Sequence, residues 1–201
     1  MRLYYLPASC SMSVHIAALE AGIDLEIAMV ELHPDGTKTA GDRDYFEINP
    51  KGKVPLLEVA EGRLTETQVI LQYVASLAPG RLPMPAEGFD RYRFLETLNF
   101  IASEIHRGFG PMWSPLIAPA HRADTVAAIG RAFGILERII GDRGFVFGHH
   151  FTIADAYAFA ITGWAPMFDM DLRQWPVLAS WRERIGARPA VVQAMREEGL
   201  I

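Results

Sequence analysis

The residue best suited to chemistry is the only cysteine of the chain, Cys10. Residues 2–6 before it are aromatic and apolar, which predicts a short strand that ends at Pro7, because proline has no N–H for a β-ladder. After the cysteine, apolar residues recur at helical spacing until Gly22, a residue typical of a helix end. The sequence therefore predicts that Cys10 lies between a strand end and a helix start.

Such a position can activate a thiol. Unpaired backbone N–H groups and the positive end of the helix dipole favour the thiolate. Tyr5 and Ser11 supply hydroxyl groups nearby. We therefore expect a lowered pKa for Cys10. The alternative is a small, buried and unreactive side chain, which is the usual state of a single cysteine.

The composition narrows the class of protein. Half of the 201 residues are hydrophobic, which is ample for a core, and the net charge is −5. The absence of a basic run argues against nucleic acid as a partner. We find neither an apolar stretch long enough for a bilayer nor a signal-peptide pattern. One cysteine cannot form an internal disulfide, so we expect a reduced, cytoplasmic protein.

Residues 1–78 carry the pattern of an α/β domain, in the order βαβ and then ββα. A strand–helix–strand unit favours parallel pairing of its strands. Thr65 and Gln68 match a capping box and predict the start of the last helix of this region. The expected elements are strand 2–6, helix 11–22, strand 25–32, polar loop 33–43, short helix 44–48, strands 56–59 and 63–64, and a helix ending near 77.

Residues 79–88 are rich in proline and glycine, which indicates a linker, and no strand pattern follows it. Residues 89–201 are therefore expected to form an all-α domain. A second capping box, Thr152 to Asp155, opens an apolar helix that we expect at the centre of this domain. The expected helices are 89–109, 122–140 and 153–164, and two more whose first turns hold Pro176 and Pro189.

This α/β plus all-α order resembles the fold of the cytosolic glutathione transferases, and the motifs resemble their bacterial beta class. The matching segments are Tyr4-Tyr5, Ala8–Ser11, Asn49–Pro55, Leu98–Phe109, Phe151–Tyr157, Trp164–Pro166 and Arg188–Val191. The resemblance implies a thioredoxin-like glutathione-binding domain at 1–78. It also implies a helical domain at 89–201 that contributes a pocket for an apolar electrophile. Glutathione is then the co-substrate, no metal is needed, and the protein is a detoxification enzyme and a homodimer.

The resemblance assigns glutathione-binding roles in the first domain. It implies a cis-proline at Pro55 that exposes the backbone of Val54, and a helix start at which Glu66 and Thr67 hold the γ-glutamyl group. Lys38 and Lys53 complete this set together with Cys10. The family usually has serine or a small residue where this chain has Thr67. The alternatives are an ordinary trans proline and a plain acidic partner for the helix dipole.

In the second domain Asn99, Ser103, His106 and Arg107 form one polar stripe at helical spacing. The resemblance implies that they approach glutathione, whose net negative charge suits His106 and Arg107. The family commonly has lysine at the position of Arg107. A polar stripe is otherwise just the solvated face of a helix.

The residues that activate the glutathione thiol remain unranked: Cys10, His106, Tyr5 and Ser11 are all candidates. The candidates for the electrophile pocket are apolar side chains that could equally belong to the core: Pro7, Met112, Trp113, Trp164, Met167 and Phe168. The adjacent His149 and His150 are a weak metal signal without further ligands, and we interpret them as loop residues.

Two other functions fit the same residues. Cys10 beside a bound thiol could form a mixed disulfide with it, which would make the protein a glutathione-dependent thiol–disulfide oxidoreductase. The fold could also serve as a non-catalytic binding or regulatory module. The chain retains Cys10, Val54-Pro55, Glu66-Thr67 and His106 together, which argues against the non-catalytic module.

Overall fold

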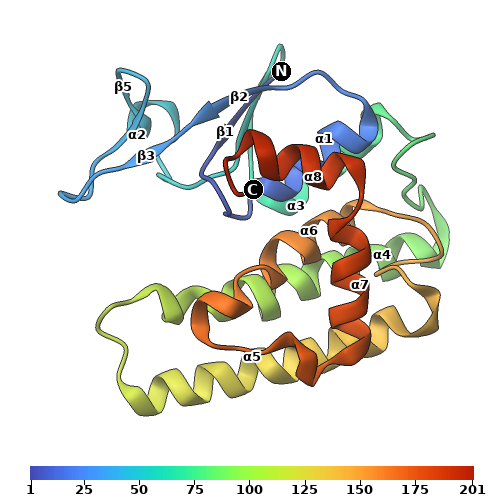
Figure 1. The fold of residues 1–201 in the computed structure, drawn as a ribbon. Helices are drawn as coiled ribbons and strands as arrows, with labels where there is room; N and C mark the ends of the chain where they lie inside the picture. Colours follow the sequence, from blue (N-terminus) through green and yellow to red (C-terminus); the bar gives the residue numbers. More distant parts are fainter. The chain divides into compact units, whose positions relative to one another are not determined.

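The computed structural model describes residues 1–201, and the chain divides into two compact units (Figure 1). The first unit contains residues 1–83 and 189–201, and the second contains residues 84–188. The sequence placed residues 189–201 in the helical half. The structure groups them with the first unit instead, because helix α8 (Pro189–Glu197) packs against helix α1 (Met12–Ala21).

The first unit is built on a four-stranded mixed sheet of order β2-β1-β6-β7. Strand β1 pairs parallel with β2 and antiparallel with β6, as the βαβ–ββα pattern predicts, and Tyr4 stands opposite both Ala28 and Leu56. Gly22 ends α1 in the left-handed conformation, also as predicted. The strands and the third helix are β1 (Arg2–Tyr5), β2 (Glu26–Met29), β6 (Leu56–Val59), β7 (Gly62–Thr65) and α3 (Thr67–Leu77).

A second, small sheet was not predicted. The single strand expected at 25–32 is two strands that belong to different sheets, and the expected loop at 33–43 contains strand structure. These strands are two or three residues long, and their side chains are exposed or half-buried, so they carry no alternating apolar pattern. The sheet has the order β3-β4-β5, with β3 (Glu31–Leu32), β4 (Lys38–Ala40) and β5 (Arg43–Asp44), followed by α2 (Tyr45–Ile48).

The predicted capping box at Thr65 is wrong. Thr65 pairs with Leu56 as the last residue of β7, and α3 begins two residues later. The N-cap is Glu66, whose side chain makes no capping hydrogen bond and whose φ is +70°. Residues other than glycine rarely hold a positive φ, and such strain concentrates at functional positions.

The second unit is helical throughout, as predicted. Its long first helix is not uniform: the helix expected at 89–109 changes at Ile101 into a π-helical turn that ends at His106, and then into a 3₁₀ segment. Pro119 and Pro176 occupy the first turns of their helices. The elements are α4 (Gly88–Phe100), the π turn Ile101–His106, the 3₁₀ segment Arg107–Trp113, α5 (Pro119–Ile140), α6 (Ile153–Thr162) and α7 (Pro176–Gly186).

Helix α6 is the buried centre of this unit, since all ten of its residues are buried. Its predicted capping box is present. The Thr152 hydroxyl accepts a hydrogen bond from Ala154 N at 3.2 Å, and Thr152 N donates to the Asp155 carboxylate at 2.9 Å. None of the helices in either unit combines the length and the hydrophobicity that a bilayer crossing requires.

Candidate functional site

The turn that carries Cys10 is held together by Ser11. The Ser11 hydroxyl is fully buried and lies 3.2 Å from both the amide and the carbonyl of Leu6. It also lies 2.7 Å from the Ser9 hydroxyl. These contacts fix the chain between β1 and α1. In this structure Ser11 shapes the turn, and its hydroxyl is used there.

Cys10 itself meets two other predicted residues. Its side chain is buried, and its Sγ lies 3.4 Å from the carbonyl oxygen of Val54. The Thr67 side chain hydrogen-bonds the same sulfur. The Val54–Pro55 peptide bond is cis, as the resemblance implied. The structure therefore brings together three segments that are far apart in sequence: the Cys10 turn, Val54-Pro55 and the start of α3.

The expected lowering of the Cys10 pKa is contradicted. Burial raises the pKa of the Cys10 thiol to about 11. The Thr67 hydrogen bond and the backbone N–H groups of Cys10 and Ser11 act in the opposite direction, and the charge of Glu66 adds to the increase. The effect of desolvation on the Cys10 pKa therefore outweighs the effect of the helix start. Cys10 is consequently a neutral S–H group at neutral pH.

We predict that alkylation of Cys10 by iodoacetamide will show this directly, because only the thiolate reacts. The rate should keep rising with pH beyond the free-cysteine value of about 8.5. The measurement is the alkylation rate between neutral and alkaline pH, followed by intact mass. A plateau reached below about pH 8 would mean that the thiolate is stabilised after all.

The start of α3 presents unpaired donors. The first helical hydrogen bonds run from the amides of Val69 and Ile70 to the Glu66 carbonyl. The Thr67 and Gln68 amides, which precede them, have no acceptor within the helix. Thr67 is buried, whereas the Glu66 carboxylate is exposed and pairs with Lys51 at 2.7 Å. Such a helix start can accept a carboxylate.

The turn before Val54 is fixed by its own polar contacts. The Lys53 carbonyl accepts hydrogen bonds from Asn49 Nδ2 at 2.6 Å and from the Tyr45 hydroxyl at 2.9 Å. Lys38 donates to the Gly52 carbonyl at 2.6 Å. Burial, and then the charge of Lys53, lower the pKa of Lys38. The ammonium of Lys53 is exposed, so of the two predicted lysines it is the one that faces solvent.

Tyr5 and Pro7 border the same turn. Tyr5 is the last residue of β1 and is buried, whereas Pro7 is half-buried. Burial, and then the charge of Glu198, raise the pKa of the Tyr5 phenol. Tyr5 is therefore a neutral phenol at physiological pH and cannot serve there as a phenolate base.

In the second unit, His106 joins an aromatic cluster. Its Nδ1 lies 2.7 Å from the Tyr157 hydroxyl, and its ring packs edge-on against Trp164 with centroids 5.3 Å apart. Trp164 in turn contacts Trp113 at 5.3 Å, and Trp113 packs on Phe168 at 4.9 Å. We call these residues the aromatic cluster: His106, Phe109, Trp113, Tyr157, Trp164 and Phe168.

The polar stripe divides at the π turn. Asn99, Ser103 and Arg107 are exposed, whereas His106 is half-buried against the aromatic cluster. The change from α to π geometry alters the helical period, which is why even spacing did not keep the four on one face. Among the predicted pocket residues of this unit, Met112 and Trp164 are buried, and Trp113 and Met167 are exposed.

Three residues near these groups were missed. Tyr157, in the middle of the apolar helix α6, carries a hydroxyl group that contacts His106. His15 and Glu198 meet near the Cys10 turn although they are 183 residues apart. A lone tyrosine in an apolar helix is a usable signal for the first contact. The His15–Glu198 contact has no such signal in the sequence, because two adjacent glutamates near a chain end are typical of a solvated surface.

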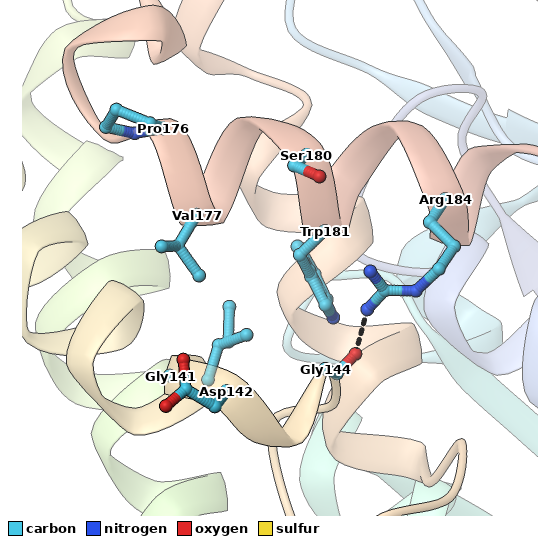
Figure 2. A pocket seen from close by; sticks show the side chains of 9 residues that line it. Gly141, Asp142, Gly144, Pro176, Val177, Ser180, Trp181 and Arg184 are labelled. Carbon is cyan, nitrogen blue, oxygen red and sulfur yellow. Dashed lines mark hydrogen bonds between the residues drawn. The ribbon is translucent and has the colours of Figure 1, made fainter.

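The structure also has a cavity away from these residues. One cavity of about 350 Å³ opens between α7 and the turn after α5, where Val177, Trp181 and Arg184 face Asp142 and Gly144 (Figure 2). Arg184 donates to the Gly144 carbonyl there. None of the predicted site residues lines this cavity. His149 and His150 are exposed, and residues 1–201 contain no group of three or more His, Cys, Asp or Glu side chains arranged to hold a metal ion.

Comparisons with known proteins agree with this arrangement. Residues 1–76 match the family model "Glutathione S-transferase, N-terminal domain", and residues 108–189 match the C-terminal domain model. The glutathione S-transferase GstA of Escherichia coli O157:H7 is 36% identical over 202 residues, covering 100% of both chains.

Two solved structures carry the same fold over the full chains. A sphingomonad glutathione S-transferase complexed with glutathione matches with a TM-score of 0.90 and 34% identity, covering 100% of both chains. The bacterial beta class enzyme of Sphingomonas chungbukensis matches with a TM-score of 0.90 and 32% identity over the same coverage. The chain is a member of the glutathione S-transferase family and is similar to its bacterial beta class.

Proposed function

We propose that this protein binds glutathione on the first unit and transfers its thiolate to small apolar electrophiles. The observation that carries the proposal is the meeting of Cys10, cis Val54-Pro55 and Thr67 at the open start of α3. The glutathione complex of the sphingomonad relative supports glutathione as the co-substrate.

Each part of glutathione has a matching group on this surface. The Val54 amide makes no hydrogen bond within the chain, so it can pair with the cysteinyl backbone as an added strand would. The start of α3 suits the γ-glutamyl carboxylate. The exposed carboxylate of Glu66 suits the ammonium of the same group, and exposed Lys53 suits the glycyl carboxylate.

In the reaction the sulfur of glutathione is the nucleophile. Its thiolate attacks an electrophilic carbon, a C–S bond forms, and the leaving group departs with its electron pair. A neutral Cys10 can donate an S–H hydrogen bond to that thiolate, which stabilises it without competing as a nucleophile. The same neutrality disfavours disulfide exchange, because exchange requires the Cys10 thiolate.

The second unit supplies an apolar surface for the electrophile. Trp113, a member of the aromatic cluster, is 48% exposed, and Met167, which precedes the cluster residue Phe168 in sequence, is 58% exposed. Exposed aromatic and thioether groups bind flat apolar molecules well. We propose that they, with Met112 and Trp164, form the electrophile-binding surface of this unit.

We also propose a cytoplasmic homodimer. The one cysteine is free, which suits a reducing compartment. Phe89 and Tyr92 on α4 are 69% and 66% exposed, and Phe46 of the first unit is 43% exposed, so each unit offers apolar area to a second copy. Sedimentation at micromolar concentration should give twice the chain mass, and a monomer would contradict this part.

The test of the function is product formation. Purified protein is incubated with glutathione and 1-chloro-2,4-dinitrobenzene, an apolar arene with a good leaving group. We expect release of chloride and a thioether whose mass is that of the glutathione adduct, at a rate well above the reaction without protein. A rate equal to the uncatalysed one, together with no calorimetric binding of glutathione, would contradict the proposal.

A further inference from the structure

Helix α8 reaches the Cys10 turn through one carboxylate. The side chain of Glu198, directly after α8, is fully buried, and its Oε2 accepts a hydrogen bond from the Ala8 amide at 3.2 Å. Figure 1 shows α8, in red, beside α1. The C-terminal segment of the first unit is thus hydrogen-bonded to its N-terminal segment at Ala8, two residues before Cys10.

Ala8 is held in an unusual conformation at this contact. Its φ is +58°, one of only three positive values among the non-glycine residues of the chain. An L-residue with a side chain rarely adopts this region unless its surroundings impose it. Ala8 is the third residue of a turn that the Ser9 amide closes onto the Leu6 carbonyl at 3.1 Å, and the hydrogen bond to Glu198 fixes the direction of the Ala8 N–H in that turn.

Glu198 is itself held by a charged histidine. His15 is buried in α1, with Nδ1 at 3.1 Å from Glu198 and Nε2 at 2.7 Å from Glu197. A carboxylate can only accept, so both ring nitrogens donate and the ring is an imidazolium. Burial lowers the pKa of His15, but the hydrogen bonds and charges of Glu198 and Glu197 raise it by more.

We propose that Glu198, held by His15, is a positioning residue that fixes the Pro7–Cys10 turn in the conformation that receives glutathione. Glu198 acts through Ala8 and does not touch the reacting atoms. The inference rests on the proposed function, in that glutathione is the ligand of this turn. The adjacent Glu197 provides a matched control, because it also bonds His15 but makes no hydrogen bond to the turn.

The first readout needs no glutathione. Cys10 is the only cysteine, so the rate of iodoacetamide labelling by intact mass reports on this turn alone. In Glu198→Ala the turn loses its contact with the α8 end, and we expect labelling about tenfold faster, the size of one charge-assisted hydrogen bond. Glu197→Ala should label at the wild-type rate. Equal rates in wild type and Glu198→Ala would overturn the proposal.

The second readout separates positioning from general stability. Glu198→Ala should raise the KM for glutathione about tenfold and leave the KM for the electrophile unchanged. Adding Ala8→Gly should restore much of the glutathione KM, because glycine accepts a positive φ without help. No recovery in the double variant would place the effect in α8 docking and overturn the proposal.

Two further comparisons keep the test decisive. Should Glu198→Ala fail to fold, Glu198→Gln retains the shape and an acceptor for Ala8 but loses the charge that holds His15. Glu198→Gln should show a smaller increase in the labelling rate and in the KM for glutathione. Wild-type values of both quantities would contradict the inference. A wild-type protein that does not bind glutathione would refute the proposed function alone, since the labelling rates still decide the role of Glu198.

Discussion

Asp155→Ala is expected to lower the free energy of unfolding by about 3–5 kcal/mol. The Asp155 carboxylate is fully buried and accepts hydrogen bonds from Val146 N and Thr152 N, both at 2.9 Å, and from Trp181 Nε1 at 3.1 Å. Its removal leaves three buried N–H groups without an acceptor, each of which costs about 1–3 kcal/mol. The measurement is urea unfolding followed by tryptophan fluorescence.

The matched control is Asp90→Ala. Asp90 also lies in the first turn of a helix, but it is exposed and caps no amide, so the change should stay within about 0.5 kcal/mol. Asp155→Asn keeps one acceptor oxygen, so its loss in free energy of unfolding should lie between those of Asp155→Ala and Asp90→Ala. A loss below about 1 kcal/mol in Asp155→Ala would show that its hydrogen bonds contribute little net stability.

The same carboxyl also predicts a pH dependence. Burial raises the pKa of Asp155 to about 6, although the four hydrogen bonds to it act in the opposite direction. Between about pH 4 and 6 the folded protein therefore holds a proton that the unfolded chain releases. The contribution of Asp155 to stability should decline as pH rises through this window, and Asp155→Asn should remove that decline.

Glu66→Ala is expected to weaken glutathione binding by about 1.5–3 kcal/mol, or roughly 10- to 150-fold in Kd. Glu66 has the carboxylate nearest the open start of α3 and holds a positive φ there. Its exposed side chain, now paired with Lys51, can take the ammonium of the γ-glutamyl group instead. Titration calorimetry with glutathione measures the change.

Two variants make this test specific. Glu61→Ala removes an exposed carboxylate from the turn between β6 and β7 and should leave the Kd unchanged. Glu66→Gln keeps the hydrogen-bond acceptor without the charge and should lose part of the affinity. Equal affinity in wild type and Glu66→Ala would remove Glu66 from the binding site, while the α3 amides and Val54 would remain.

Much of the fold was predictable because apolar periodicity and capping residues act locally. The βαβ–ββα order, the Gly22 helix end and the Thr152–Asp155 capping box all follow from neighbours in sequence. The Thr65 capping box failed because Thr65 is needed in the β7 ladder, and tertiary pairing overrode the local motif. The β3-β4-β5 sheet carries no apolar pattern, so periodicity could not reveal it.

The sequence anticipated which residues lie near Cys10 better than it anticipated the protonation state of Cys10. Val54, Thr67 and Cys10 do meet, but the direction of the Cys10 pKa shift depends on burial, which no local pattern reports. The contact of Glu198 with Ala8 joins residues 190 positions apart and was equally invisible. The sequence therefore placed Cys10 correctly between a strand end and a helix start, but the expected direction of its pKa shift was wrong.

We propose that glutathione, and not Cys10, supplies the nucleophile of the conjugation reaction. The conjugation rate of Cys10→Ala with glutathione and 1-chloro-2,4-dinitrobenzene, compared with wild type at pH 7, tests this assignment. The variant loses an S–H donor and a buried side chain, so we predict a rate within about tenfold of wild type and the same thioether product. A folded Cys10→Ala protein that binds glutathione but forms no thioether above the uncatalysed rate would instead make Cys10 essential to the reaction.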